Sequence, residues 1–210
     1  VRLFIMKIES IVSRGFQENT WIVAANNSKK ALIIDPGADF ERVKKRLKDF
    51  QLTPLAILNT HLHPDHLISA YELQNHYKIP LYAHKNEEKT FEMFDQMVQM
   101  LGFDNLKKPE VSKWLDDEDL EFDGLLVKVI HTPGHTPGSC CFLINERYLF
   151  SGDTVFEGSI GRTDLPFGSR DEMRKSLKKI VDLPINIKIY PGHGSQTKLA
   201  KELNSNPYLI

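Results

Sequence analysis

The chain has 210 residues, of which 41% are hydrophobic and 26% are charged. This composition excludes an intrinsically disordered chain, because such chains carry too little apolar side chain to build a core. The formal net charge is -1 at pH 7, so no overall positive charge attracts nucleic acid or an anionic membrane. We therefore expect a globular protein with neither nucleic acid nor a membrane as its partner.

Patterns typical of strands and of helices alternate along the chain. In the first half the predicted elements are strands at 8–12, 20–25 and 31–34, a helix at 39–50, a strand at 55–59, a helix at 66–77, a strand at 81–83 and a long helix at 87–101. In the second half they are strands at 125–130, 140–144 and 148–150, a helix at 170–181, a strand at 187–190 and a closing helix from about residue 198. Strands dominate both halves, so we expect one α/β domain over residues 1–210, with two sheets packed face to face and helices outside.

The predicted helix at 87–101 is rich in phenylalanine and methionine. A core-facing stripe is the simpler interpretation, since Phe91, Phe94 and Met97 recur at nearly helical spacing. The surplus beyond one stripe favours a second apolar surface, either a pocket wall, a lid or a homodimer contact. We take Phe91 and Phe94 as candidate substrate-binding residues. The polar stretch at 107–119 is predicted to be a surface loop anchored by Trp114 and Leu115.

The segment that follows the predicted strand at 55–59 carries the strongest chemical signal. It reads His61-Leu-His-Pro-Asp-His66. In an extended backbone, residues two apart project to the same side, so His61 and His63 face one way. Asp65 and His66 follow where a helix is predicted to begin. Three histidines and one aspartate within six residues supply ligands that zinc, iron and manganese accept, whereas the simpler alternative is a loop of surface histidines.

Three more candidate ligands also follow predicted strands. His135 lies between Gly134 and Gly138, and His193 lies in the sequence Pro-Gly-His-Gly. Asp153 lies just past the strand at 148–150. Because strand ends belong to a rigid scaffold, they can direct all these side chains toward one point. The other three histidines, His76, His84 and His131, are predicted to lie outside the metal site, with His76 solvated, His84 at the surface or capping a turn, and His131 orienting the His135 loop.

This order of motifs resembles the metallo-β-lactamase superfamily over nearly the whole chain, and within it the short glyoxalase II-like hydrolases. The resemblance implies a four-layer αβ/βα sandwich of two mixed sheets with a dinuclear metal site where the sheets meet. It implies that His61, His63 and His135 bind the first metal, that Asp65, His66 and His193 bind the second, and that Asp153 bridges them. The implied cofactors are two divalent ions, zinc first, with iron or manganese as alternatives.

The resemblance also implies a reaction. The two metals would supply a hydroxide for attack on the carbonyl of a thioester such as S-D-lactoylglutathione, or of a related acyl substrate, and Asp65 and Asp153 would be the catalytic residues. Thioesters are favoured because a thiolate leaves without a strong acid. The alternatives are another ester or lactone hydrolase, a persulfide dioxygenase with one iron on His61, His135 and Asp153, and a metal-binding scaffold without activity.

Two departures from better-known family members bear on the substrate. No cysteine lies near a ligand motif, so antibiotic hydrolysis is not expected. Only 17 residues follow His193, so we expect the C-terminal helical domain of full-length glyoxalase II to be missing. Substrate recognition is then expected to be broad and weak, with a high KM for S-D-lactoylglutathione. The glycine-rich loop at 157–169 contains Arg162, which either binds a substrate carboxylate or braces the loop by pairing with Asp164.

The cysteines and the N-terminus predict a cytoplasmic location. Cys140 and Cys141 are adjacent, and neighbouring cysteines do not readily form a disulfide with each other. Both are predicted to pack within a strand. The apolar run at residues 3–6 is shorter than the apolar core of a signal peptide.

Overall fold

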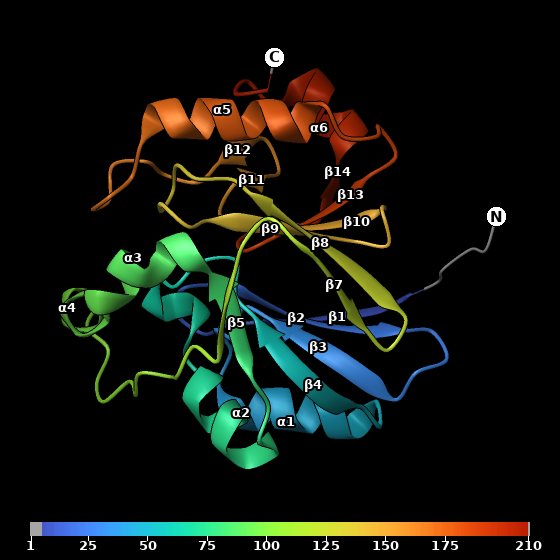
Figure 1. The fold of residues 1–210 in the computed structure, drawn as a ribbon, viewed down its shortest axis with the longest axis vertical. Helices are drawn as coiled ribbons and strands as arrows, with labels where there is room; N and C mark the ends of the chain where they lie inside the picture. Colours follow the sequence, from blue (N-terminus) through green and yellow to red (C-terminus); the bar gives the residue numbers. More distant parts are fainter. Residues whose placement is uncertain (1–5, 210) are drawn as a thin grey trace.

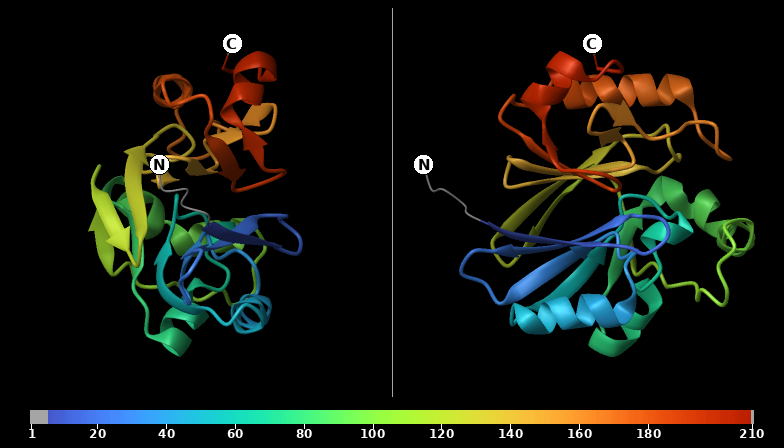
Figure 2. Two further views of the ribbon diagram at one scale, coloured as in Figure 1. Left: turned by 90° about the vertical axis from the view of Figure 1, so that its right-hand side faces the viewer. Right: turned by 180° about the vertical axis from the view of Figure 1, so that it is seen from behind.

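The structure is a computed structural model that describes residues 6–209 (Figure 1). The apolar run at residues 3–6 lies mostly outside this range. Two six-stranded sheets face each other in the middle of the molecule, and helices cover the outer face of each (Figure 2). This arrangement confirms the four-layer sandwich. None of the described helices is long and apolar enough to cross a membrane.

The first sheet is built from the N-terminal half of the chain. Its strands, in spatial order, are β1 (Met6–Val12), β2 (Asn19–Ala25), β3 (Lys30–Ile34), β4 (Thr53–Leu58), β5 (Leu81–His84) and β6 (Lys113–Leu115). The first three strands pair antiparallel, whereas β3 to β6 pair parallel. The connecting helices are α1 (Phe40–Asp49), the 3-10 turn Pro64–His66, α2 (Ala70–Tyr77), the 3-10 turn Lys85–Glu87, α3 (Glu88–Glu92) and α4 (Phe94–Met100).

The second sheet comes from the C-terminal half. Its spatial order is β14 (Thr197–Lys198), β13 (Lys188–Pro191), β10 (Tyr148–Gly152), β9 (Cys140–Ile144), β8 (Leu125–His131) and β7 (Asp119–Phe122). Helices α5 (Arg170–Val181) and α6 (Leu199–Ser205) cover its outer face, and β11 (Val155–Phe156) and β12 (Ser159–Ile160) form a separate hairpin.

Apolar side chains pack in three layers, one between the sheets and one beneath the helices on each side. Strand β9 shows why the sheets are buried on both faces. Cys140 packs between the sheets and Cys141 packs toward α5, because successive side chains of a strand point to opposite faces. Both thiols are buried and free, as the prediction of strand packing requires.

Three predicted elements differ from the structure. The helix at 87–101 is interrupted at Met93, whose ψ of 7° turns the chain between α3 and α4. The helix at 66–77 begins at Ala70, because Ser69 donates its backbone N–H to Pro36. The segment at 107–119 is not a simple loop, since Trp114 and Leu115 belong to β6, which pairs with β5. In the last two cases a contact with a distant segment overrides the local pattern.

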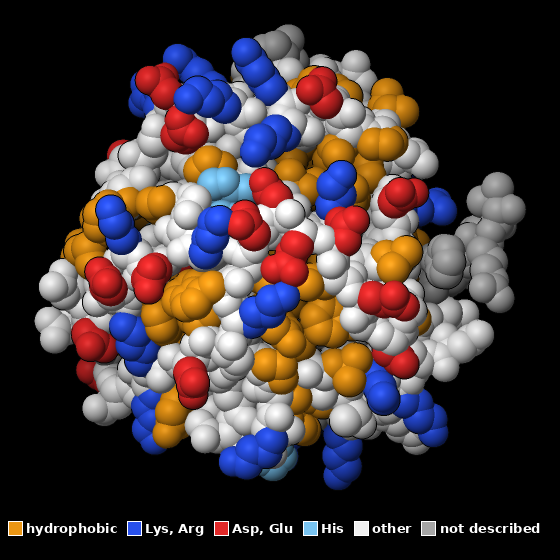
Figure 3. Space-filling view, viewed as in Figure 1, with side chains coloured by type: hydrophobic (Ala, Val, Ile, Leu, Met, Phe, Trp, Pro, Cys, Tyr) orange, Lys and Arg blue, Asp and Glu red, His pale blue; other side chains and the backbone are white. Residues whose placement is uncertain are grey.

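The face seen in Figure 3 carries basic and acidic side chains that are intermingled. Neither sign of charge forms a large patch on this face. The distribution there agrees with the near-zero net charge of the chain.

Candidate metal centre

The candidate ligands converge at one edge of the sandwich. His61, His63, Asp65 and His66 follow β4, and His135 follows β8. Asp153 follows β10, and His193 follows the parallel strand β13. Although the residues span 133 positions of sequence, their donor atoms form overlapping groups within 4.8 Å. The prediction that strand ends bring them together is confirmed.

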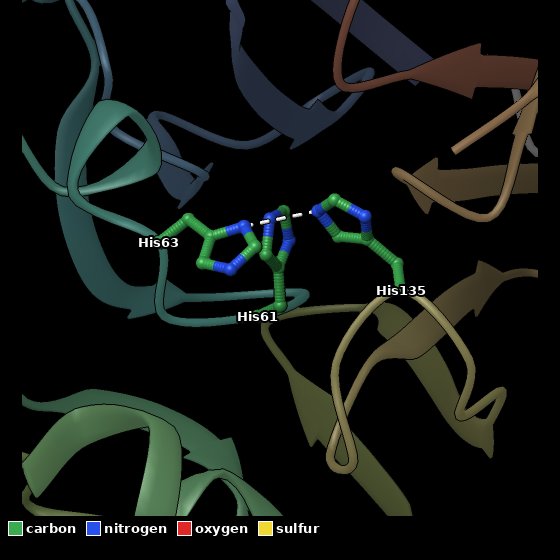
Figure 4. A group of neighbouring side chains, drawn as sticks. All are labelled: His61, His63 and His135. Carbon is green, nitrogen blue, oxygen red and sulfur yellow. Dashed lines mark hydrogen bonds between the residues drawn. The ribbon is translucent and has the colours of Figure 1, made fainter. Parts of the chain in front are cut away.

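The first group contains His61, His63 and His135 (Figure 4). The Nδ1 atom of His63 lies 3.0 Å from the Nε2 atom of His135, and all three imidazoles are at most 8% exposed. Burial lowers the pKa of His63 to about 3 and lowers that of His61 well below its usual value. Both rings are therefore neutral at pH 7, which is the form that donates a lone pair to a metal.

The second group contains Asp65, His66 and His193. The Nε2 atom of His193 lies 3.4 Å from Oδ2 of Asp65 and 3.3 Å from Nε2 of His66. Burial opposes protonation of His66, but the carboxylates of Asp65, Asp153 and Asp35 outweigh it and raise the pKa of His66. The neighbouring imidazoles in turn lower the pKa of Asp65, although burial opposes this, so its carboxylate is ionised.

Asp153 lies between the two groups. Its Oδ2 atom is 3.5 Å from Nε2 of His135 in the first group and 3.7 Å from Nε2 of His193 in the second. Its Oδ1 atom is 3.5 Å from Nε2 of His66. One carboxylate thus faces donors of both groups, which is the position required of a bridging ligand.

Two observations test whether these residues fit a divalent cation. Among the described residues, the buried atoms Nε2 of His61 and Oδ1 of Asp153 have no hydrogen-bond partner, an arrangement that costs free energy unless a cation is bound. The interatomic distances quoted above run from 3.0 to 3.7 Å. Ligands about 2.0–2.2 Å from a tetrahedral ion are separated by similar distances. The residues therefore fit divalent metal binding.

Asp35 supports one imidazole in each group. Its Oδ2 atom accepts a hydrogen bond from Oγ1 of Thr60 at 2.7 Å and lies 3.2 Å from Nδ1 of His66. The same Thr60 hydroxyl lies 3.1 Å from Nδ1 of His61. Contacts at Nδ1 orient both rings so that their Nε2 atoms point into the centre. The sequence interpretation missed Asp35, although it follows strand β3 just as Asp153 follows β10.

Glu87 links the two loops that supply the first group. Its Oε2 atom accepts the backbone N–H of Leu62, between His61 and His63, at 2.8 Å. Its Oε1 atom accepts the backbone N–H of Gly138, in the His135 loop, at 2.8 Å. A side chain at Gly138 would overlap the Glu87 backbone, so glycine is required there. No sequence signal identified Glu87, because it lies in a charged stretch that is typical of an exposed turn.

Backbone groups complete the centre. The Nδ1 atom of His135 lies 2.7 Å from the carbonyl oxygen of Arg162, which places Nε2 toward Asp153. A Cβ atom at Gly192 would lie 2.4 Å from Oδ1 of Asp153, so glycine lets β13 approach the site.

The three predicted substrate residues differ in their surroundings. Both Nε and Nη2 of Arg162 hydrogen-bond to the carboxylate of Asp164, at 2.8 and 2.7 Å, which is the bracing alternative. Phe94 is fully buried in the core, and Phe91 packs against that core. Neither ring lines the cavity above the centre. The turn at Met93 accounts for this difference, because it places Met93, Met97 and Met100 along the cavity instead.

The cavity has a volume of about 450 Å³, within the range of small-molecule sites. Ligand candidates from both groups lie on its floor, including His63, Asp65, His135, Asp153 and His193. The centre is therefore accessible to a substrate.

The remaining histidines lie away from the ligand groups. His84 is buried rather than at the surface, and its Nδ1 atom accepts the N–H of Asn86, which is the predicted cap. His131 stacks on His84 and contacts the carbonyl oxygen of Pro137 at 2.8 Å, so it does orient the His135 loop. His76 is exposed, as predicted.

Comparison with known proteins identifies the family. The sequence model of the metallo-beta-lactamase superfamily matches residues 13–193, so the chain belongs to this superfamily. The chain is 35% identical to the hydroxyacylglutathione hydrolase GloC of Haemophilus influenzae, covering 97% of this chain and 98% of that protein.

Two solved structures are also similar, each with a TM-score of 0.86. The B3 metallo-beta-lactamase BLEG-1 is 34% identical to this chain in sequence, and the superposition covers 97% of this chain and 100% of the BLEG-1 chain. TTHA1623, solved in a di-iron-bound form, is 32% identical to this chain, and the superposition covers 96% of this chain and 100% of the TTHA1623 chain.

Proposed function

We propose that this member of the metallo-beta-lactamase superfamily is a dinuclear hydrolase that cleaves thioesters or closely related acyl substrates. One observation carries the proposal: two separate donor groups share Asp153 at the floor of a substrate-sized cavity. The similarity to a protein named as a hydroxyacylglutathione hydrolase supports the thioester class. A cytoplasmic location belongs to the same proposal.

The chain would hold two divalent cations through seven side chains. When bound, such cations supply hydroxide at neutral pH and positive charge facing a developing oxyanion. In the first group His61 and His63 act as neutral donors, and Asp65 and Asp153 provide the compensating negative charge. Among the residues that line the cavity, these two aspartates are the carboxylates available to accept a proton from the attacking water.

The leaving group favours thioesters over amides. Outside the candidate ligands, the lining residues include one ionisable side chain, Arg162, and its guanidinium is bonded to Asp164. Outside the candidate ligands, the described lining residues therefore include no side chain that could act as a strong general acid. A thiolate needs none, because its conjugate acid has a pKa of about 8.5.

We propose zinc as the native metal, with iron as the alternative suggested by the di-iron form of TTHA1623. The donor set supports two ions, because the second group offers three donors in addition to the shared Asp153. A one-iron persulfide dioxygenase would need only His61, His135 and Asp153 and would leave the second group unused.

The test combines metal analysis with a substrate panel. Protein purified as isolated and protein reloaded with zinc or iron is assayed with S-D-lactoylglutathione, simple thioesters, a lactone and a β-lactam, while an oxygen electrode follows glutathione persulfide. We expect two metal ions per chain and thioester hydrolysis without oxygen uptake. One iron with oxygen uptake would instead identify a dioxygenase, faster cleavage of the β-lactam would identify a β-lactamase, and no turnover would leave a metal-binding scaffold.

A further inference from the structure

We infer, on the basis of the proposed function, that the acyl group accepted by this site is apolar and uncharged and lies against α4. The lining of the cavity carries this inference. Met93, Met97, Met100 and Leu101 line it from α4 and its ends, and Phe156 and Ile160 line it from the β11–β12 hairpin. We call the first four residues the methionine wall.

The methionine wall exposes apolar surface that does not pack against the protein core. Met100 is 73% exposed and Leu101 is 43% exposed, although both are apolar. Burying them beneath an apolar acyl chain removes this surface from water, which favours binding. Methionine also has three rotatable bonds, so the wall can adapt to acyl groups of different shapes.

Charge complementarity points away from a glutathione tail in the same cavity. That tripeptide carries two carboxylates and one ammonium group. Outside the candidate metal ligands, Arg162 is the charged side chain among the described lining residues, and Asp164 already binds two of its nitrogen atoms. A substrate carboxylate placed there would have to compete with that aspartate. An acyl group without charge meets no such competition.

The decisive experiment is an acyl-length series with one uncharged thiol. The metal-loaded protein is assayed with the acetyl, butanoyl, hexanoyl and octanoyl thioesters of N-acetylcysteamine, and with S-D-lactoylglutathione. We expect kcat/KM to rise about two- to fourfold for each added methylene until the cavity is filled, because that is the range expected for partial to full burial of a methylene. We also expect the hexanoyl thioester to exceed S-D-lactoylglutathione in kcat/KM.

Variants of the methionine wall separate this inference from a general loss of activity. Met100→Glu places a charge on an exposed position, so the fold is retained. It should lower kcat/KM about tenfold more for the hexanoyl thioester than for the acetyl thioester. Ile185→Glu is the matched control, because Ile185 is 63% exposed and does not line the cavity. Ile185→Glu should leave kcat/KM unchanged for both the hexanoyl and the acetyl thioester.

A binding measurement provides a readout that needs no turnover. Hexyl and ethyl thioethers of N-acetylcysteamine, which cannot be hydrolysed, are titrated into metal-loaded protein by calorimetry. The hexyl compound should bind more tightly, and Met100→Glu should reduce the difference in affinity about tenfold.

The outcomes distinguish the inference from the function on which it rests. Thioester hydrolysis without dependence on acyl length, or with S-D-lactoylglutathione as the preferred substrate, would overturn the inference and leave the proposed hydrolase intact. No hydrolysis of any thioester would overturn the proposed function. Equal binding of the two thioethers would then also reject the apolar acyl site.

Discussion

The two donor groups differ in burial and in charge, although they share Asp153. His61, His63 and His135 are at most 8% exposed, and burial keeps His61 and His63 neutral. In the second group the side chains of Asp65 and His193 are 15% and 27% exposed. Carboxylates there raise the pKa values of His66 and His193 against the effect of burial. The comparison indicates that His61 and His63 are preformed as neutral ligands, whereas the second group must release protons when a metal binds.

Removing the shared carboxylate should have the largest effect, because it breaks both groups at once. We expect Asp153→Ala to lower kcat/KM by at least about 100-fold, since even partners of metal ligands contribute 10- to 100-fold. Metal content, measured by mass spectrometry, should fall below two ions per chain. Unchanged metal content with full activity would contradict the bridging assignment.

Single imidazole replacements should separate the groups. His66→Ala should remove mainly the second metal, because His66 lies with Asp65 and His193, although it also lies near His61 and Asp153. His63→Ala should remove mainly the first metal, because among the described residues His63 groups only with His61 and His135. Zinc titrations of both variants, followed by calorimetry, check this expectation. Equal loss of both metals in either variant would show that the two groups act as one site.

The first group should depend on Glu87 although this residue contacts neither metal nor substrate. Glu87→Gln keeps one acceptor oxygen but replaces the other by a donor, so one of the N–H groups of Leu62 and Gly138 loses its partner. We expect first-metal affinity to fall about 10-fold with second-metal affinity retained.

Glu88→Gln provides the control for Glu87, because Glu88 is adjacent and exposed. It should leave both metal affinities unchanged. A loss of thermal stability in Glu87→Gln without a change in first-metal affinity would show that Glu87 supports the fold alone.

Proton release should distinguish the groups without any mutation. At pH 7 the His63 pKa of about 3 means that this ring has no proton to lose when a metal binds. His66 has a raised pKa in the metal-free protein, so it is protonated at pH 7 and must release a proton. Calorimetry in buffers of different ionisation enthalpy should therefore detect release mainly with the second metal. If more protons were released with the first metal than with the second, the assignment of the neutral ligands to the first group would be wrong.

The smallest effect is expected outside both groups, at Arg162. Its contact with His135 uses the backbone carbonyl, which Arg162→Ala retains, and its side chain is bonded to Asp164. We expect kcat/KM to change less than about threefold, since exposed ion pairs contribute little. A larger rise in KM that is confined to carboxylate-bearing substrates would favour the substrate-binding role.

The sequence by itself determined most of the strands, the two-sheet architecture and the seven candidate ligands. Hydrophobic periodicity is a local property, so the strand at 140–144 and the helix at 170–181 match the structure in both bounds. The ligand candidates were recognisable because each follows a strand in a distinctive motif, and parallel strand ends meet at one edge.

Only the tertiary structure decided which further polar residues serve the centre and which residues form the cavity wall. Asp35 and Glu87 acquire their roles from partners 25 or more positions away, so no local pattern identifies them. The turn at Met93 buries Phe94 and turns the methionines toward the cavity, and Asp164 occupies the guanidinium of Arg162. These outcomes depend on which distant surfaces are in contact, and periodicity along the chain carries no information about that.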